Sequence, residues 1–128
     1  MSHRSRLAGF IIDCQGGNHD AAADFWSRAL GLPRGETHVD GQARYTALTG
    51  MPAGGTARGS AAVDHPSRVH LDIEADDIDA EAARLEALGA TRIGFVKRWW
   101  VMQAPSGQRF CVVRMKHPEQ GAEPNRWD

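Results

Sequence analysis

Cysteine is scarce in this sequence, and that scarcity narrows the fold. Only Cys14 and Cys111 occur among its 128 residues, which excludes a small domain built on several disulfide bonds. Since the thiols of a reducing compartment remain free, we do not expect the two cysteines to form a bridge. Stability must therefore come from a packed core, and the 41% of apolar residues is enough for one.

Long hydrophobic runs and an excess of one charge sign are also missing. Leu7 to Ile12 is the longest apolar run near the N-terminus, too short for a membrane helix of about 20 residues or for a signal peptide. With 15 basic and 16 acidic residues, the net charge of −1 argues against nucleic acid or an acidic membrane as partner. We expect a single cytoplasmic domain. Thirteen of the basic residues are Arg, which is typical of a GC-rich bacterial genome.

Two helical segments repeat 58 residues apart. In the first, Asn18 or Asp20 can cap a helix that carries apolar residues at helical spacing up to Leu30, and Gly31 ends it. In the second, Asp76 or Asp77 caps a similar apolar stripe that Gly89 ends.

Strand patterns surround both helices. Residues 9–14 and 69–74 alternate between two faces before each helix, as a half-buried strand does. Short β-like runs follow the helices, at residues 44–48, 59–63, 91–95, 98–103 and 109–115. Each half therefore reads strand, helix, then two or three strands, and an internal repeat of this kind determines the fold prediction.

The same segments resemble a known superfamily. Residues 68–73, 76–81 and 85–91 are similar to the second module of the vicinal oxygen chelate superfamily, which contains glyoxalase, bleomycin-resistance proteins and extradiol dioxygenases. Residues 12–14, 25–26 and 29–32 are similar to the opening of its first module, and residues 105–113 to its closing hairpin.

This resemblance implies an α+β fold of two βαβββ modules that form a cup-shaped mixed sheet. Module one spans about residues 7–63 and module two about 68–115, within a single glyoxalase-like domain. Residues 116–128 form a flexible tail, although Trp127 could fold back onto the domain. Fold analogy does not by itself give the reaction.

The resemblance also implies four metal-ligand positions, and this sequence fills them poorly. His70 matches the position in the second module's first strand, but the equivalent position in the first module falls on Gly9 or Phe10. The ends of the two modules fall on Cys111 and on Ser60 or Ala61. We therefore expect no metal cofactor. A zinc site of His70 and Cys111, with Asp72 nearby, is the alternative.

The turn Ala104–Gly107 predicts which residues line the cup. A regular hairpin would pair Trp100 with Cys111 and Met102 with Arg109, and turn Trp99, Val101, Phe110 and Val112 toward the helix. A slip of one residue would invert this assignment. Predicted ligand-binding residues are Trp100, Met102, Arg109, Cys111, Asp13 and Tyr45, and predicted catalytic residues are His70 and Asp72.

Two roles of the charged residues remain open. Arg109 could form an ion pair with Asp13 or Asp72, or it could hold an anionic ligand together with His70. His70 could act as a general base oriented by Asp72. The remaining histidines, at positions 3, 19, 38, 65 and 117, are expected to face solvent.

Two functions compete. The favoured one is a glyoxalase-like protein that binds a small molecule without the usual metal, either to sequester it or to carry out metal-free chemistry. The alternative is a metal-dependent lyase, isomerase or dioxygenase. Trp26 and Trp99 exceed what one small core can cover, which favours a homodimer.

Overall fold

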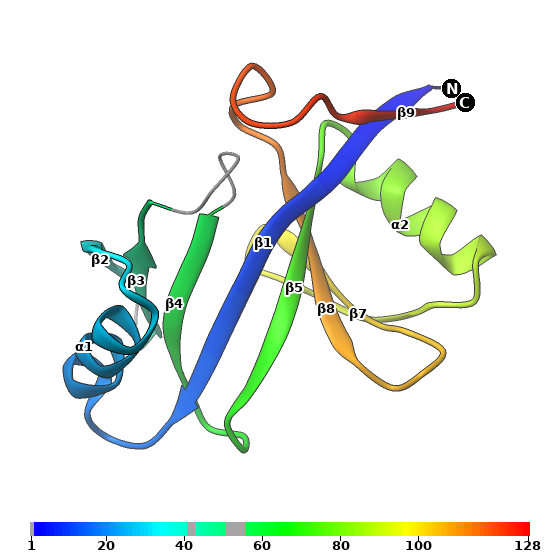
Figure 1. The fold of residues 1–128 in the computed structure, drawn as a ribbon. Coiled ribbons are helices and arrows are strands. Elements are labelled where there is room, and N and C mark those ends of the chain that lie inside the picture. The colour runs from blue at the N-terminus through cyan, green and yellow to red at the C-terminus, as the bar shows by residue number, and fades with distance from the viewer. Residues whose placement is uncertain (1, 41–42, 51–55) are drawn as a thin grey trace. The chain divides into compact units, whose positions relative to one another are not determined.

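The computed structural model describes residues 2–40, 43–50 and 56–128 (Figure 1). They divide into two compact units, one of Gly9–His70 and one of Met1–Ala8 together with Leu71–Asp128, called the first and the second unit below. Along the chain the elements follow the order βαβββ twice, and a short strand ends it. This order confirms the predicted α+β repeat.

The first unit has one helix and a mixed sheet. Its elements are β1 (His3–Gln15), α1 (His19–Leu30), β2 (Arg34–Asp40), β3 (Ala43–Leu48) and β4 (Thr56–Val63). The strand order is β2-β3-β4-β1, and β4 runs parallel to β1 while the other pairs are antiparallel. Strand β2 was not predicted from the sequence.

Both caps of α1 follow the sequence. The Oδ1 atom of Asn18 accepts a hydrogen bond from the backbone N–H of Ala21 at 3.0 Å, which satisfies one of the free amides of the first turn. Gly31 ends the helix with φ of 69°, a left-handed conformation that glycine adopts without a steric penalty.

The second unit repeats this arrangement. Its elements are β5 (Arg68–Ala75, entered at Leu71), α2 (Ile78–Ala87), β6 (Thr91–Val96), β7 (Trp99–Gln103), β8 (Arg109–Arg114) and β9 (Asn125–Trp127). The strand order is β5-β8-β7-β6, with β8 parallel to β5. Asp77 caps α2 and accepts a hydrogen bond from the N–H of Ala80 at 3.0 Å.

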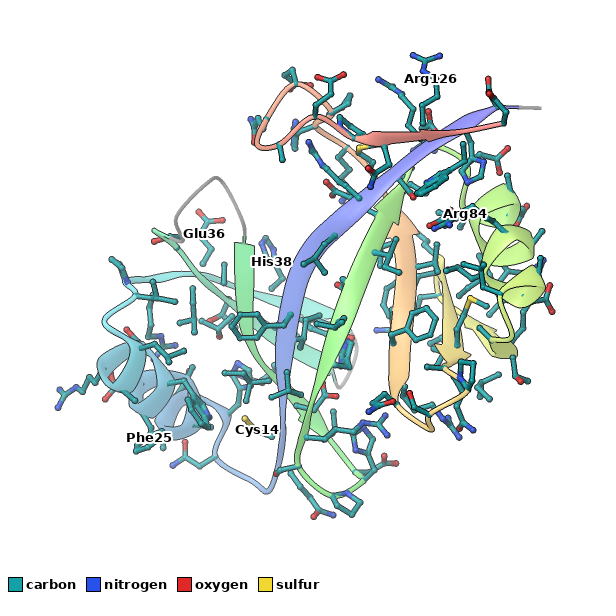
Figure 2. All side chains as sticks on the ribbon, turned by 45° about the vertical axis from the view of Figure 1, so that its right-hand side comes forward. Cys14, Phe25, Glu36, His38, Arg84 and Arg126 are labelled. Atoms are coloured by element: carbon teal, nitrogen blue, oxygen red, sulfur yellow. The ribbon has the colours of Figure 1, made fainter. Side chains whose placement is uncertain are left out.

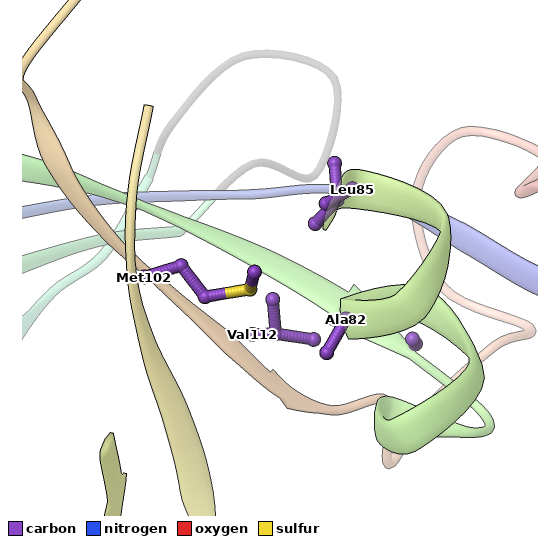
Figure 3. Packing of buried hydrophobic residues seen from close by; sticks show 5 residues of the cluster. Ala82, Leu85, Met102 and Val112 are labelled. Carbon is purple, nitrogen blue, oxygen red and sulfur yellow. The ribbon is translucent and has the colours of Figure 1, made fainter. Parts of the chain in front are cut away.

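The core of the second unit lies between α2 and the sheet (Figure 3). Met102 of β7 and Val112 of β8 are completely buried against Ala82 and Leu85 of α2, together with Ala75 of β5. Since side chains alternate along a strand, the residues next to Met102 and Val112 point to the opposite face.

The predicted register of the β7–β8 hairpin is wrong by one residue. Gln103 pairs with Arg109, so that Met102 pairs with Phe110 and Trp100 with Val112. The loop is one residue longer than expected: the N–H of Ala104 donates to the carbonyl of Gln108 at 2.9 Å. One additional loop residue moves every β7 side chain to the other face relative to β8.

The end of the tail folds back onto the second unit. Strand β9 runs antiparallel to the start of β1, and the two chain ends lie side by side (Figure 1). Arg6 holds the preceding segment: its guanidinium bonds Glu74 at 2.6 Å and the carbonyl oxygens of His117 at 2.9 Å and Ala122 at 2.5 Å.

A buried charged group connects β1, α2 and β9. Glu81 is completely buried, and its carboxylate accepts hydrogen bonds from His3 Nε2 at 2.8 Å and from Arg84 Nε and Nη2 at 2.7 and 2.9 Å. The Arg84 guanidinium lies 3.9 Å from the ring centroid of Trp127, and Trp127 Nε1 donates to Ser5 Oγ at 2.8 Å. Figure 2 shows Arg84 on the side of α2 that faces this end of the chain. Glu81, His3 and Arg84 are called the Glu81 cluster below.

Hydrogen bonding determines the protonation of Glu81. Burial raises the pKa of its carboxyl, but hydrogen bonds from Arg84, His3 and Ser5 outweigh burial and hold the pKa below the ordinary value. The expectation that His3 faces solvent is therefore wrong. Strand β1 begins at His3, earlier than the alternation of the sequence indicates, and this places the imidazole against α2.

No helix among the described residues is long and apolar enough to cross a membrane.

Candidate functional site

Asp13 of β1 is the centre of a second charged group, which lies within the first unit. Its Oδ2 atom is 2.7 Å from Nδ1 of His70 and 3.6 Å from Nε of Arg68. The Asp13 side chain is 3% exposed, that of His70 13% and that of Arg68 42%. Asp13, His70 and Arg68 are called the Asp13 cluster below.

Strand alternation explains why Arg68 and His70 reach the same carboxylate. They are two residues apart at the start of β5, so their side chains project from one face of the strand. His70 is also the last residue of the first unit. The two-residue spacing of Arg68 and His70 is visible in the sequence, but their common partner, Asp13, lies 57 residues before His70.

The sheet register places Tyr45 on the same face as Asp13. Asp13 pairs with position 61 of β4, and position 61 pairs with Tyr45 of β3. Directly paired residues share a face of the sheet. Asp13 and Tyr45, both predicted as ligand-binding residues, therefore lie on one face of the sheet, and their role in ligand binding stays a prediction.

The opposite face of this sheet packs on α1. The pKa of the Cys14 thiol is raised, mainly by burial and further by the charge of Asp13, and a hydrogen bond with Trp26 of α1 opposes the shift. His19 of α1 is buried, contrary to expectation, and its Nε2 lies 2.7 Å from Oγ1 of Thr46. Burial lowers the pKa of His19. These groups lie at the helix–sheet contact, and Asp13 lies on the opposite face of the sheet.

The hydrogen bond from His70 to Asp13 fixes the chemistry of the imidazole. A carboxylate can only accept, so Nδ1 donates and a neutral His70 carries its lone pair on Nε2. Carboxylates orient histidines in this way both in acid–base catalysis and beside bound metals. The predicted orientation of His70 by Asp72 is replaced here by orientation through Asp13.

Asp72 and Cys111 are neighbours in the second unit. They are register partners on the parallel strands β5 and β8, and Asp72 is buried while Cys111 is partly exposed. Asp72 follows His70 by two residues on β5. The donors of His70, Asp72 and Cys111 are of the types that hold a divalent metal. Of the other predicted positions, Gly9 has no side chain to offer, and the side chains at positions 60 and 61 lie outside the described residues.

Two predicted ligand-binding residues lie on the helix face of the second unit. Met102 is buried in the core, and Trp100 Nε1 donates to Asp79 of α2 at 2.9 Å. The prediction that Trp100 and Met102 share a face with Cys111 is wrong, because of the register described above. On the face with Cys111 lies Arg109, whose Nε donates to Oε1 of Gln103 at 2.8 Å.

Comparison with known proteins identifies a family and a fold. A family model described as a glyoxalase-like domain matches residues 9–113. No curated protein sequence is significantly similar to this chain.

Several solved structures share the fold. A methylmalonyl-CoA epimerase in complex with methylmalonyl-CoA and NH4+ is 16% identical, covers 86% of this chain and 95% of its own, and has a TM-score of 0.60. The methylmalonyl-CoA epimerase of Mycobacterium tuberculosis is 14% identical, with coverages of 84% and 88% and a TM-score of 0.61. A hypothetical protein of Bacillus halodurans C-125 is 12% identical, with coverages of 93% and 98% and a TM-score of 0.62.

Proposed function

Because the chain belongs to the glyoxalase-like domain family of the vicinal oxygen chelate superfamily, we propose that it binds a small organic molecule on the face that carries Asp13 and Tyr45, and that His70 exchanges a proton with this ligand. The observation that carries the proposal is the hydrogen bond of 2.7 Å between His70 and a buried carboxylate. Such a carboxylate holds the imidazole in one tautomer and stabilises its protonated form.

The proposed reaction class is proton transfer at a carbon atom next to a carbonyl group. Epimerisation of methylmalonyl-CoA, the reaction for which two of the structural relatives are named, inverts such a carbon and so requires its proton to leave and return. In the proposed reaction Nε2 of His70 takes this proton, while Asp13 holds Nδ1 and compensates the positive charge.

Isotope exchange tests this function. The protein is incubated in D2O with pyruvate, acetoacetate and their primary amides, and 1H NMR follows the loss of the signals next to the carbonyl. We expect exchange above the buffer rate for at least one compound, and its loss in His70→Gln and Asp13→Asn. His117→Gln is the matched control, since His117 is exposed and lies outside this cluster. Exchange that His70→Gln leaves unchanged would contradict the proposal.

A metal-dependent enzyme is the second candidate, favoured by the donor set alone. His70, Asp72 and Cys111 offer one nitrogen, one oxygen and one sulfur atom, a combination that suits zinc with one further position open. Asp13 would then orient His70 as a ligand. A divalent ion bound there would polarise a ligand carbonyl.

Elemental analysis separates the two candidates. One equivalent of zinc, nickel, manganese or iron in the protein purified without a histidine tag, lost in His70→Ala, would support the metal-dependent enzyme. Protein that exchanges substrate protons without a stoichiometric metal would support the metal-free proposal.

We also retain a homodimer as a proposal, together with a cytoplasmic, bacterial setting. Trp26 and Trp99 are partly buried, and the exposed apolar side chains are others, with Phe25 and Leu88 more than half exposed. In Figure 2 Phe25 lies on the outer side of α1. Sedimentation that finds only monomer at micromolar concentration would refute the dimer.

A further inference from the structure

We propose that Arg68 binds a carboxylate group of the ligand, so that the site selects small carboxylic acids over their neutral analogues. This inference rests on the proposed function to the extent that the ligand occupies the Asp13 face. It adds the chemical class of the ligand and the residue that recognises it.

The contact between Arg68 and Asp13 uses little of the guanidinium group. The distance of 3.6 Å from Nε to Oδ2 makes an ion pair, but it is too long for a hydrogen bond. A guanidinium has five N–H donors. Within the part of the chain that the structure describes, Arg68 has no further hydrogen bond or ion pair. Its two terminal nitrogens are therefore available to a ligand.

Two other arginines donate several guanidinium hydrogen bonds within the protein. Arg84 gives both Nε and Nη2 to the two oxygens of Glu81 and lies over the ring of Trp127. Arg6 bonds one carboxylate and backbone carbonyls of the C-terminal segment. Both bind groups that hold the fold together, whereas Arg68 is 42% exposed and lies beside the pair of Asp13 and His70.

The position of Arg68 suits a ligand that also meets His70. The two side chains project from the same face of β5, and both contact Oδ2 of Asp13. A ligand carboxylate on this face would meet the exposed guanidinium of Arg68, and its two oxygens match the planar fork of that group.

Binding experiments with matched probes test the inference. Pyruvate, acetoacetate, pyruvamide, acetoacetamide and inorganic phosphate are titrated separately into 15N-labelled protein, and backbone amide shifts give each Kd. We expect at least one carboxylate to bind at least ten times more tightly than its amide. Arg68→Gln should weaken that carboxylate about tenfold or more and leave the amide unchanged, as expected when one charged hydrogen-bonding partner is lost.

The control is a variant that removes a positive charge elsewhere in the first unit. Arg28→Gln removes the same charge from the same unit at a helix position that is 83% exposed, so it should leave the preference intact. Equal losses in the two variants would assign the effect to net charge and overturn the inference. So would the absence of any carboxylate preference, or phosphate binding more tightly than every carboxylate.

The two proposals fail in different ways. If Arg68→Gln abolishes the carboxylate preference but no compound exchanges its protons in the wild-type protein, the recognition stands and the proton-transfer function fails. If acid and amide bind equally well and exchange depends on His70, the function stands and the role of Arg68 fails.

Discussion

Both units contain a carboxylate that contacts one histidine and one arginine, but solvent reaches the two groups differently. In the Glu81 cluster the carboxylate is completely buried, and the arginine binds both of its oxygens at hydrogen-bonding distance. In the Asp13 cluster the arginine is more than a third exposed and stays at 3.6 Å. The same three kinds of group, a carboxylate, an imidazole and a guanidinium, thus form a tightly bonded cluster in one unit and a looser one in the other.

The difference follows from the elements that surround each group. Glu81 lies in α2, and β1 with its His3 and β9 with its Trp127 pack against that helix. The Asp13 cluster is formed by two strand ends on the face of its sheet opposite α1. A charge that is covered on all sides must be fully hydrogen-bonded, whereas the Arg68 guanidinium is 42% exposed and can also be hydrated.

Removing the charge of Glu81 should have the largest effect on stability. We expect Glu81→Gln to lower the free energy of unfolding by about 3 kcal/mol, because it leaves His3 and Arg84 without their buried ionic partner. Urea denaturation followed by circular dichroism measures this loss. Glu86→Gln is the matched control on the same helix, where an exposed pair with Arg92 should contribute about 0–1 kcal/mol. Similar losses in the two variants would remove the distinction between a buried and a surface pair.

Acid should destabilise the protein partly through the same residue. Since hydrogen bonds hold the folded-state pKa of Glu81 below that of the unfolded chain, its ionised form stabilises the fold above about pH 4.3. That stability should be lost as the pH falls through the lower folded-state pKa.

Denaturation midpoints between pH 6 and pH 3 measure this loss. Asp76 contributes as well. Burial raises the pKa of its carboxyl, but hydrogen bonds from Arg4 outweigh burial and hold the pKa below the ordinary value. The wild-type curve should therefore fall more steeply than that of Glu81→Gln, which still contains Asp76. Parallel curves would show that folding does not lower the pKa of Glu81.

Trp127 should contribute less than Glu81. Phenylalanine keeps an aromatic face for Arg84 but loses the N–H that bonds Ser5, so Trp127→Phe should cost about 1 kcal/mol. Arg126→Gln, at the neighbouring exposed position of β9, is the control and should be nearly neutral. A neutral Trp127→Phe variant would mean that the hydrogen bond to Ser5 contributes little to stability.

The sequence predicts local features of this fold well, because their causes are local. Asn18, Gly31 and Asp77 cap their helices as expected, since each acts within one turn of its own position. The assignment of Phe110 and Val112 to the helix face is also correct, because alternation within β8 decides it.

The features that could not be predicted from the sequence depend on residues far apart in the chain. The β7 register depended on one additional loop residue, and that residue moved Trp100 and Met102 to the other face. His3 and Glu81 are 78 positions apart, and His70 and Asp13 are 57 apart. No periodicity connects such pairs, so the sequence named His70 and Asp13 as site residues without pairing them.

Arg68→Gln should have the smallest effect on stability, and it tests the difference between the Asp13 cluster and the Glu81 cluster most directly. Because Arg68 is 42% exposed and its ion pair is long, its loss should change the free energy of unfolding by less than about 0.5 kcal/mol. Arg84→Gln should cost clearly more, since Glu81 would lose two hydrogen bonds in a buried setting. Urea denaturation of both variants under one set of conditions gives the two values. If Arg68→Gln destabilises the protein as much as Arg84→Gln does, Arg68 is a structural partner of Asp13, and its donors are needed by the fold rather than by a ligand.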